Sequence, residues 1–120
     1  MEQFECIELK TENEEQISVV KFKDEKVMDP GRIEQLGNEL MEVASRDDNC
    51  KLLINFDNVR FFSSQAINKL IVLDRRVKAG GGQIRLSNLR PEVRDLFSYT
   101  NLDSVFEIRD EEEDALQSFQ

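Results

Sequence analysis

The sequence predicts one α/β domain over residues 1–120, with a mixed β-sheet and about four helices mostly on one side of it. Two short runs rich in Val, Ile and Phe, residues 4–10 and 17–23, are separated only by the polar residues 11–15. So short a link joins antiparallel strands, because a parallel pair needs a long crossover. The rest of the chain alternates between helical and strand patterns, which predicts parallel strands covered by helices.

The first helix is expected directly after Asp29-Pro30-Gly31, which ends a brief strand at Val27-Met28. Apolar residues then recur every three or four positions, which is the spacing of one helix face. They are Ile33, Leu36, Leu40, Val43 and Ala44. The polar residues 46–49 follow, so we expect the helix to end there.

The next strand and helix form the centre of the predicted fold. Residues 52–56 are a nearly unbroken apolar run, typical of a strand buried on both faces. A helix follows that either Ser63 or Ser64 can cap, and Gly80-Gly81-Gly82 ends it because glycine accepts the left-handed conformation. Its predicted buried stripe consists of Ala66, Leu70, Leu73 and Val77.

The last third of the chain contains two strand patterns and two helix patterns, at residues 83–87, 91–101, 105–108 and 110–119. Pro91 stands at a favourable first helical position, and Asn101 can close that helix in the left-handed conformation. Asp110 and Glu113 have the spacing of a capping box, which predicts where the final helix begins.

The composition excludes several classes of function. With 25 acidic and 16 basic residues, the net charge of −9 has the wrong sign for binding nucleic acid or an anionic membrane. No apolar run is long enough to span a membrane and no signal peptide precedes the domain, so we expect a cytoplasmic protein without membrane insertion. The chain has no His, which rules out Ser-His-Asp catalysis. Cys6 and Cys50 are expected to be inert thiols on core strands, without a disulfide.

No cofactor and no enzymatic activity are expected. The glycine run at residues 80–82 follows a helix and precedes a strand, whereas phosphate-binding loops lead from a strand into a helix. The acidic residues 47–48 and 111–113 lie at predicted helix ends, where solvated charge is the ordinary explanation.

The two adjacent hydroxyls at Ser63 and Ser64 are the feature that capping alone does not explain. One serine suffices to bond the free amides at the start of the helix. The second would be free for modification, and a helix N-terminus tolerates a phosphate because its amides and dipole favour negative charge.

The layout resembles the STAS domain of bacterial anti-sigma factor antagonists over almost the whole chain. Three blocks carry the likeness in the same order: residues 52–73 with Phe-x-Ser-Ser opening the central helix, residues 79–84, and residues 88–103. The family pattern around the switch is Asp-Ser-Ser-Gly, and its second serine, the phosphorylation site, falls on Ser64, with Ser63 as the alternative. This chain has Phe62 in place of the acid and Gln65 in place of the glycine.

The resemblance implies a regulatory binding module. Its partner would be an anti-sigma factor with a histidine-kinase-like ATPase fold, a serine kinase that phosphorylates Ser64, and a serine phosphatase would reverse the modification. Binding of the unphosphorylated form would release the sigma factor and so regulate transcription. The residues expected to contact the partner are Asn58, Arg60, Phe62, Ser63, Ser64, Gln65, Asn68 and Lys69.

Three alternatives remain open. Phe62 and Gln65 favour a STAS scaffold that works without phosphorylation. A STAS subunit associated with a transporter is a second. A weak nucleotide-binding domain is the third, and the lack of a phosphate loop argues against it.

Overall fold

The structure is a computed structural model that describes residues 4–14 and 16–119. Its strands are β1 (Ile7–Glu12), β2 (Ile17–Phe22), β3 (Lys26–Val27), β4 (Lys51–Asn55), β5 (Phe61–Phe62), β6 (Gln83–Ser87) and β7 (Glu107–Arg109). Its helices are α1 (Pro30–Ala44), α2 (Ser64–Ala79), α3 (Pro91–Tyr99), the 3-10 turn η1 (Leu102–Ser104) and α4 (Glu112–Gln117).

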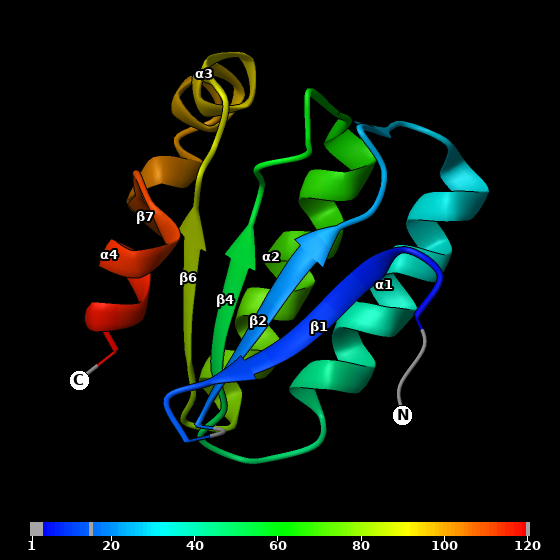
Figure 1. The fold of residues 1–120 in the computed structure, drawn as a ribbon. Helices are drawn as coiled ribbons and strands as arrows, with labels where there is room; N and C mark the ends of the chain where they lie inside the picture. Colours follow the sequence, from blue (N-terminus) through cyan, green and yellow to red (C-terminus); the bar gives the residue numbers. More distant parts are fainter. Residues whose placement is uncertain (1–3, 15, 120) are drawn as a thin grey trace.

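The main sheet has the order β1-β2-β4-β6-β7 (Figure 1). β1 and β2 form the predicted antiparallel hairpin, and every later neighbour in the sheet is parallel. This confirms the mixed sheet. Two short strands, β3 and β5, pair in parallel as a separate small sheet, in which Val27 lies opposite Phe62.

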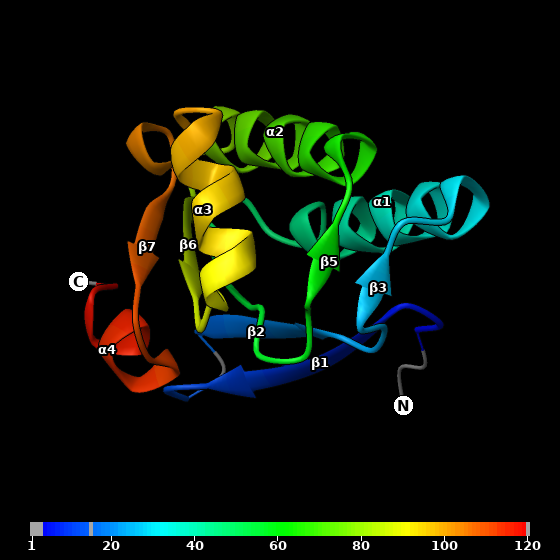
Figure 2. The ribbon, with the colours of Figure 1, turned by 90° about the horizontal axis from the view of Figure 1, so that it is seen from above.

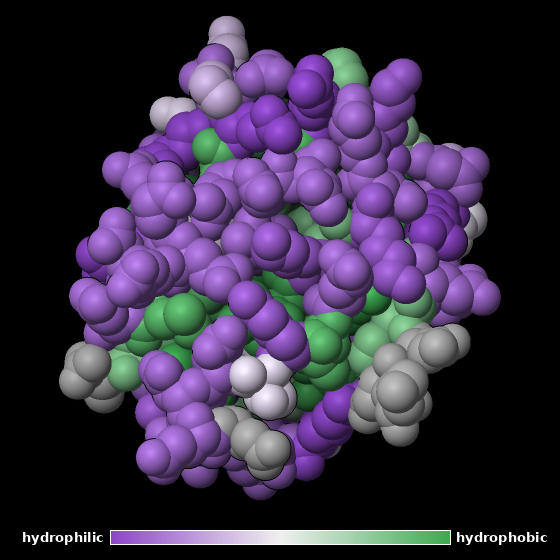
Figure 3. Space-filling model, in the orientation of Figure 1, coloured by the Kyte–Doolittle hydropathy of each residue, from purple (hydrophilic) through white to green (hydrophobic). Residues whose placement is uncertain are grey.

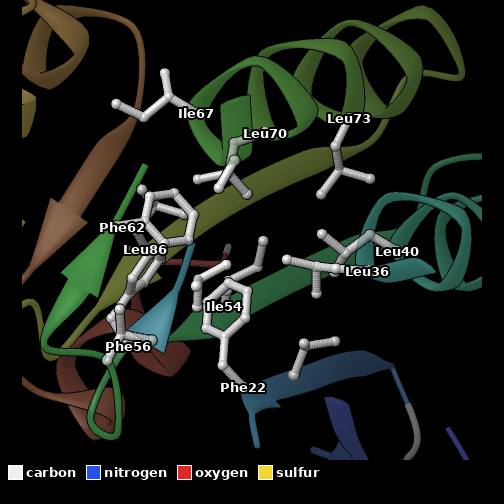
Figure 4. Packing of buried hydrophobic residues seen from close by; sticks show 14 of the residues in the cluster. Phe22, Leu36, Leu40, Ile54, Phe56, Phe62, Ile67, Leu70, Leu73 and Leu86 are labelled. Atoms are coloured by element: carbon white, nitrogen blue, oxygen red, sulfur yellow. The ribbon is translucent and has the colours of Figure 1, made fainter. Parts of the chain in front are cut away.

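The helices lie unequally on the two faces of the main sheet. Figure 2 shows α1, α2 and α3 on one side and α4 alone on the other, as the sequence predicts. The larger core lies under α1 and α2, where side chains from β2, β4 and β6 meet those of the helices (Figure 4). A second, smaller cluster lies under α4 and consists of Ile17, Val19, Leu53, Ala115 and Phe119.

Backbone geometry confirms the predicted ends of α2 and α3, whereas α1 begins at Pro30, inside the segment that the sequence predicts as a break. The Asp29 carboxylate accepts the Arg32 N–H at 2.8 Å and caps α1. Gly81 has φ +78° at the end of α2, and Asn101 has φ +60° after α3, both in the left-handed region. The predicted capping box of Asp110 and Glu113 is wrong. Helix α4 begins at Glu112 with no side-chain cap, and its acidic first turn complements the helix dipole instead.

The remaining differences from the predicted elements come from contacts between distant residues. Phe61–Phe62 is a strand that the sequence pattern does not predict, because within the described residues it pairs with the distant strand β3 alone. The first strand begins at Ile7 rather than at residue 4, since the Cys6 N–H donates to the Glu39 carboxylate at 2.9 Å. Cys6 and Cys50 therefore precede β1 and β4 instead of lying on them.

Candidate functional site

The junction between β5 and α2 is built around Ser63, which ends the small sheet and caps the helix. Its backbone N–H donates to the Val27 carbonyl of β3 at 3.1 Å. Its Oγ accepts the Ala66 N–H at 3.2 Å, and its carbonyl accepts the Ile67 N–H at 3.0 Å. Ser63 is thus the cap, and its hydroxyl is already used by the fold.

Ser64 is the first residue of α2 and is exposed to solvent. Within residues 4–14 and 16–119, no hydrogen bond engages its hydroxyl. The first turn of α2 carries no acidic residue, so the positive end of the helix dipole lies unneutralised beside it. Of the two serines, Ser64 is therefore the one whose hydroxyl can accept a modification without disturbing the cap.

Phe62 is not available to a partner, which corrects its place among the expected contact residues. Its side chain is only 7% exposed and points into the core. There its ring centroid lies 5.7 Å from that of Phe22 and 5.3 Å from that of Phe56 (Figure 4). It also lies 6.4 Å from the ring centroid of Phe97. This aromatic packing anchors β5, the strand that precedes Ser63, so the role of Phe62 is to hold Ser63 in position.

Lys69 is half-buried and holds α1 and α2 together. Its aliphatic chain lies across Gly37 of α1, where an added Cβ would come within 2.8 Å of its Cδ. Its ammonium group pairs with the Glu34 carboxylate. The lysine is therefore committed to helix packing, whereas Asn68 is exposed and Gln65 half-buried on the same helix.

Asn58 and Arg60 shape the turn that leads into β5. The Asn58 side-chain amide donates to the Phe22 carbonyl at 2.9 Å. The Arg60 N–H donates to the Glu25 carbonyl at 2.9 Å, while its exposed guanidinium lies 3.6 Å from the Glu25 carboxylate. Both residues are exposed, and the charged side chain of Arg60 is 53% exposed.

Two exposed apolar side chains on or next to the small sheet of β3 and β5 are not among the partner-contact residues predicted from the sequence. Met28 follows β3 and is 52% exposed, and Phe61 of β5 is 49% exposed. The Lys26 ammonium lies 5.7 Å from the Phe61 ring centroid, a cation–π distance. Neighbouring strand residues point to opposite faces, so burial of Phe62 places Phe61 outside. Recognition of β5 as a strand would have revealed this.

No three acidic or cysteine side chains among residues 4–14 and 16–119 come together in a way that could hold a metal ion. Burial raises the pKa of the Cys6 thiol to about 11, with the nearby Glu39 carboxylate adding to the effect, and burial also raises the pKa of Cys50. Both thiols are consequently protonated and unreactive near neutral pH. No helix in the described part of the chain is long and apolar enough to cross a membrane.

A sequence model of the STAS domain matches residues 8–115. The chain belongs to the STAS domain family. Among solved structures, this STAS domain is similar to an anti-sigma factor antagonist domain protein from Planctomyces limnophilus, with 23% identity and a TM-score of 0.84. That match covers 93% of this chain and 96% of the other.

Two further structures share the STAS fold. The anti-sigma factor antagonist SpoIIAA from Bacillus, in its phosphorylated form, is 18% identical with a TM-score of 0.68, over 96% of this chain and all of that one. The murine anion transporter Slc26a9 is 16% identical with a TM-score of 0.72, over 85% of this chain but 17% of that one. At these identities the likeness establishes the common fold, and the site residues must be argued from this chain's own geometry.

Proposed function

We propose that this STAS domain is an anti-sigma factor antagonist whose binding to an anti-sigma factor is controlled by phosphorylation of Ser64. The observation that carries the proposal is that the two adjacent serine hydroxyls have different environments. Ser63 Oγ bonds the Ala66 amide, and Ser64 is exposed at the first position of the same helix. The name of the Planctomyces protein and the phosphorylated form of SpoIIAA support the same role.

In this proposal the domain acts by binding and catalyses no reaction of its own. The anti-sigma factor is a serine kinase with a histidine-kinase-like ATPase fold, and a serine phosphatase removes the phosphate. The domain and the sigma factor then compete for binding to the anti-sigma factor, and the outcome of this competition regulates sigma-dependent transcription.

The physical switch is the charge that a phosphate adds to Ser64. Phosphoserine carries about −1.5 to −2 charges at neutral pH, on a chain that already carries −9. The amides and dipole at the start of α2 stabilise that charge in the free domain, so the fold tolerates it. In a complex the same charge would have to be desolvated against the partner, which opposes binding.

The surface around Ser64 supplies both apolar and polar contacts for a partner. Met28 and Phe61 are exposed apolar side chains, and Arg60 and Asn68 are exposed polar ones. Aromatic residues and arginine are enriched among the residues that dominate binding energy. Lys69, by contrast, serves mainly to join α1 to α2.

The test combines a kinase assay with binding measurements on a purified anti-sigma kinase. After incubation with kinase and ATP, mass spectrometry should locate one phosphate on Ser64. By calorimetry, Ser64→Ala should bind like wild type, whereas Ser64→Asp should bind about tenfold more weakly or worse. Ser45→Asp is the matched control, because Ser45 is exposed at the C-terminal end of α1 and the substitution adds the same charge. Phosphate on Ser63 would reverse the assignment.

Two other functions have a specific observation in their favour. A STAS scaffold that works without phosphorylation is supported by Phe62, a core residue at the position where the family pattern has an acid. Binding to the kinase with no phosphate on either serine would favour it. A transporter-associated role is supported by the likeness to Slc26a9, in which the matched region is a small part of the chain. Genes adjacent to the one encoding this chain would separate that role from an antagonist.

A further inference from the structure

Strand β1 is an edge strand whose outer side is unpaired. It is the first strand in the order β1-β2-β4-β6-β7, and no described strand pairs with its other side (Figures 1 and 2). Six residues long, β1 offers more free backbone than β7, the opposite edge, which has three. Such an edge presents N–H and C=O groups ready to pair with another strand.

The direction of these free groups follows from the hairpin register. The Lys23 N–H donates to the Cys6 carbonyl at 2.9 Å, and Ile7 lies opposite Phe22. Hydrogen-bonded pairs alternate along an antiparallel ladder, so residues 6, 8, 10 and 12 turn their backbone groups toward β2. The backbone groups of Ile7, Leu9 and Thr11 therefore point outward.

We infer that β1 pairs with β1 of a second copy of this chain, antiparallel and with a two-fold axis through Leu9. In this register Glu8 of each copy lies opposite Lys10 of the other, on the face of the sheet that carries α4. Leu9 meets its counterpart on the opposite face. The two main sheets then form one continuous sheet across the axis.

Charge selects this register among those that the outward groups permit. Antiparallel pairing of odd-numbered residues allows the axis to pass through any residue of β1. An axis at Leu9 or Lys10 pairs five of the six strand residues, whereas every other axis pairs three or fewer. An axis at Glu8 places that carboxylate opposite itself. An axis at Lys10 places two ammonium groups together and sets Glu8 against Glu12. The axis at Leu9 creates two opposite-charge pairs, and such pairs directly across a ladder are stabilising.

The surface beside the edge has room and charge for the incoming carboxylate. A shallow hollow of about 260 Å³ lies there, lined by Glu8, Leu9, Lys10, Val19 and Lys21. Figure 3 shows a face of the molecule on which polar residues surround apolar surface in its lower half. The Lys10 ammonium, 3.0 Å from Glu112 and 3.4 Å from Glu12, has three N–H donors, so one is left for Glu8 of the other copy.

The test is sedimentation equilibrium over a range of concentrations at physiological ionic strength, where long-range repulsion is screened over about 8 Å. Wild type should show a reversible monomer–dimer equilibrium. Glu8→Lys and Lys10→Glu should each weaken association about tenfold or more, because each replaces two attractive pairs by two repulsive ones. The double swap of both residues should restore it.

Changes in net charge distinguish this pairwise contact from repulsion between the overall charges of the two copies. Glu8→Lys changes the net charge from −9 to −7, which would strengthen association if overall repulsion governed it. The double swap keeps −9 and reverses only the local pattern. Glu12→Lys is the matched control on the same strand, since Glu12 meets no charged residue in the proposed register, and its association should be no weaker than that of wild type.

Two further variants are chosen to weaken association without destabilising the folded monomer. Glu8→Gln removes both attractive pairs without placing a lysine opposite Lys21 on β2, and should weaken association less than Glu8→Lys. Thr11→Pro removes an outward-facing N–H at an exposed position of the same edge, so it should abolish association while thermal unfolding stays close to that of wild type. A wild-type protein that is monomeric at about 1 mM, or a double swap that fails to restore association, overturns the inference.

Discussion

Replacing Ser63 by alanine should destabilise the domain by about 1 kcal/mol or slightly more, whereas the same change at Ser64 should be nearly neutral. The Ser63 Oγ accepts the Ala66 N–H at 3.2 Å, and Ala66 is completely buried. Its amide would lose its side-chain acceptor where water enters poorly, which places the cost in the upper part of the range for lost caps. Ser64 is exposed, so its truncation should stay within about 0.5 kcal/mol of wild type.

Urea unfolding, fitted with one common dependence on denaturant, measures both free energies of unfolding. A loss of ~1 kcal/mol corresponds to a midpoint lowered by roughly 4 °C in a thermal scan of a domain this size. Ser63→Asp is the positive control, because aspartate also caps helices and should recover most of the loss. Equal effects at Ser63 and Ser64, or a Ser63→Ala midpoint within error of wild type, would refute the assignment of the cap.

Two further predictions concern carboxylates that join distant parts of the chain. Glu39→Gln should lower the free energy of unfolding by about 2 kcal/mol in urea titrations, because the buried carboxylate accepts the backbone N–H groups of Glu5 and Cys6. The control is Glu42→Gln on the exposed face of α1, which should change the free energy of unfolding little. Burial alone would raise the pKa of Glu112, but its hydrogen bond from Asn55 and its pairing with a lysine outweigh this and hold the pKa below the ordinary 4.5. The charged form therefore contributes stability above pH 4.5 that is lost as the pH falls through the folded-state pKa, so the stability difference between wild type and Glu112→Gln should shrink in acid.

Local signals in the sequence predicted the order of elements and most of their ends. The hairpin follows from a link too short for a crossover, and the ends of α2 and α3 follow from Gly81 and Asn101. Each of these effects acts within a few residues, so it is present in the sequence itself. The cap at Ser63 belongs to the same class, because a hydroxyl placed before a helix finds its amide partner two or three residues ahead.

The sequence pattern could not decide which residues of the candidate site face solvent. Phe62 was expected at the partner surface and lies in the aromatic core, while Phe61 and Met28 are exposed. Two adjacent phenylalanines are equivalent in a hydropathy pattern until a partner strand fixes which one points inward. Lys69 looked free on the polar side of its helix, but Gly37 of α1 leaves a space that its aliphatic chain fills.

By itself, then, the sequence determined a mixed α/β sheet, the capped start of α2 and the two hydroxyls placed there, because short-range geometry and apolar periodicity specify them. The likeness of three sequence blocks to known STAS domains indicated the family. Only the tertiary structure decided that β3 pairs with β5, that Glu39 holds the start of β1, and that β1 is left as an open edge. Those features depend on contacts between residues far apart in the chain. Such contacts form only when the whole core has assembled, and no local pattern encodes them.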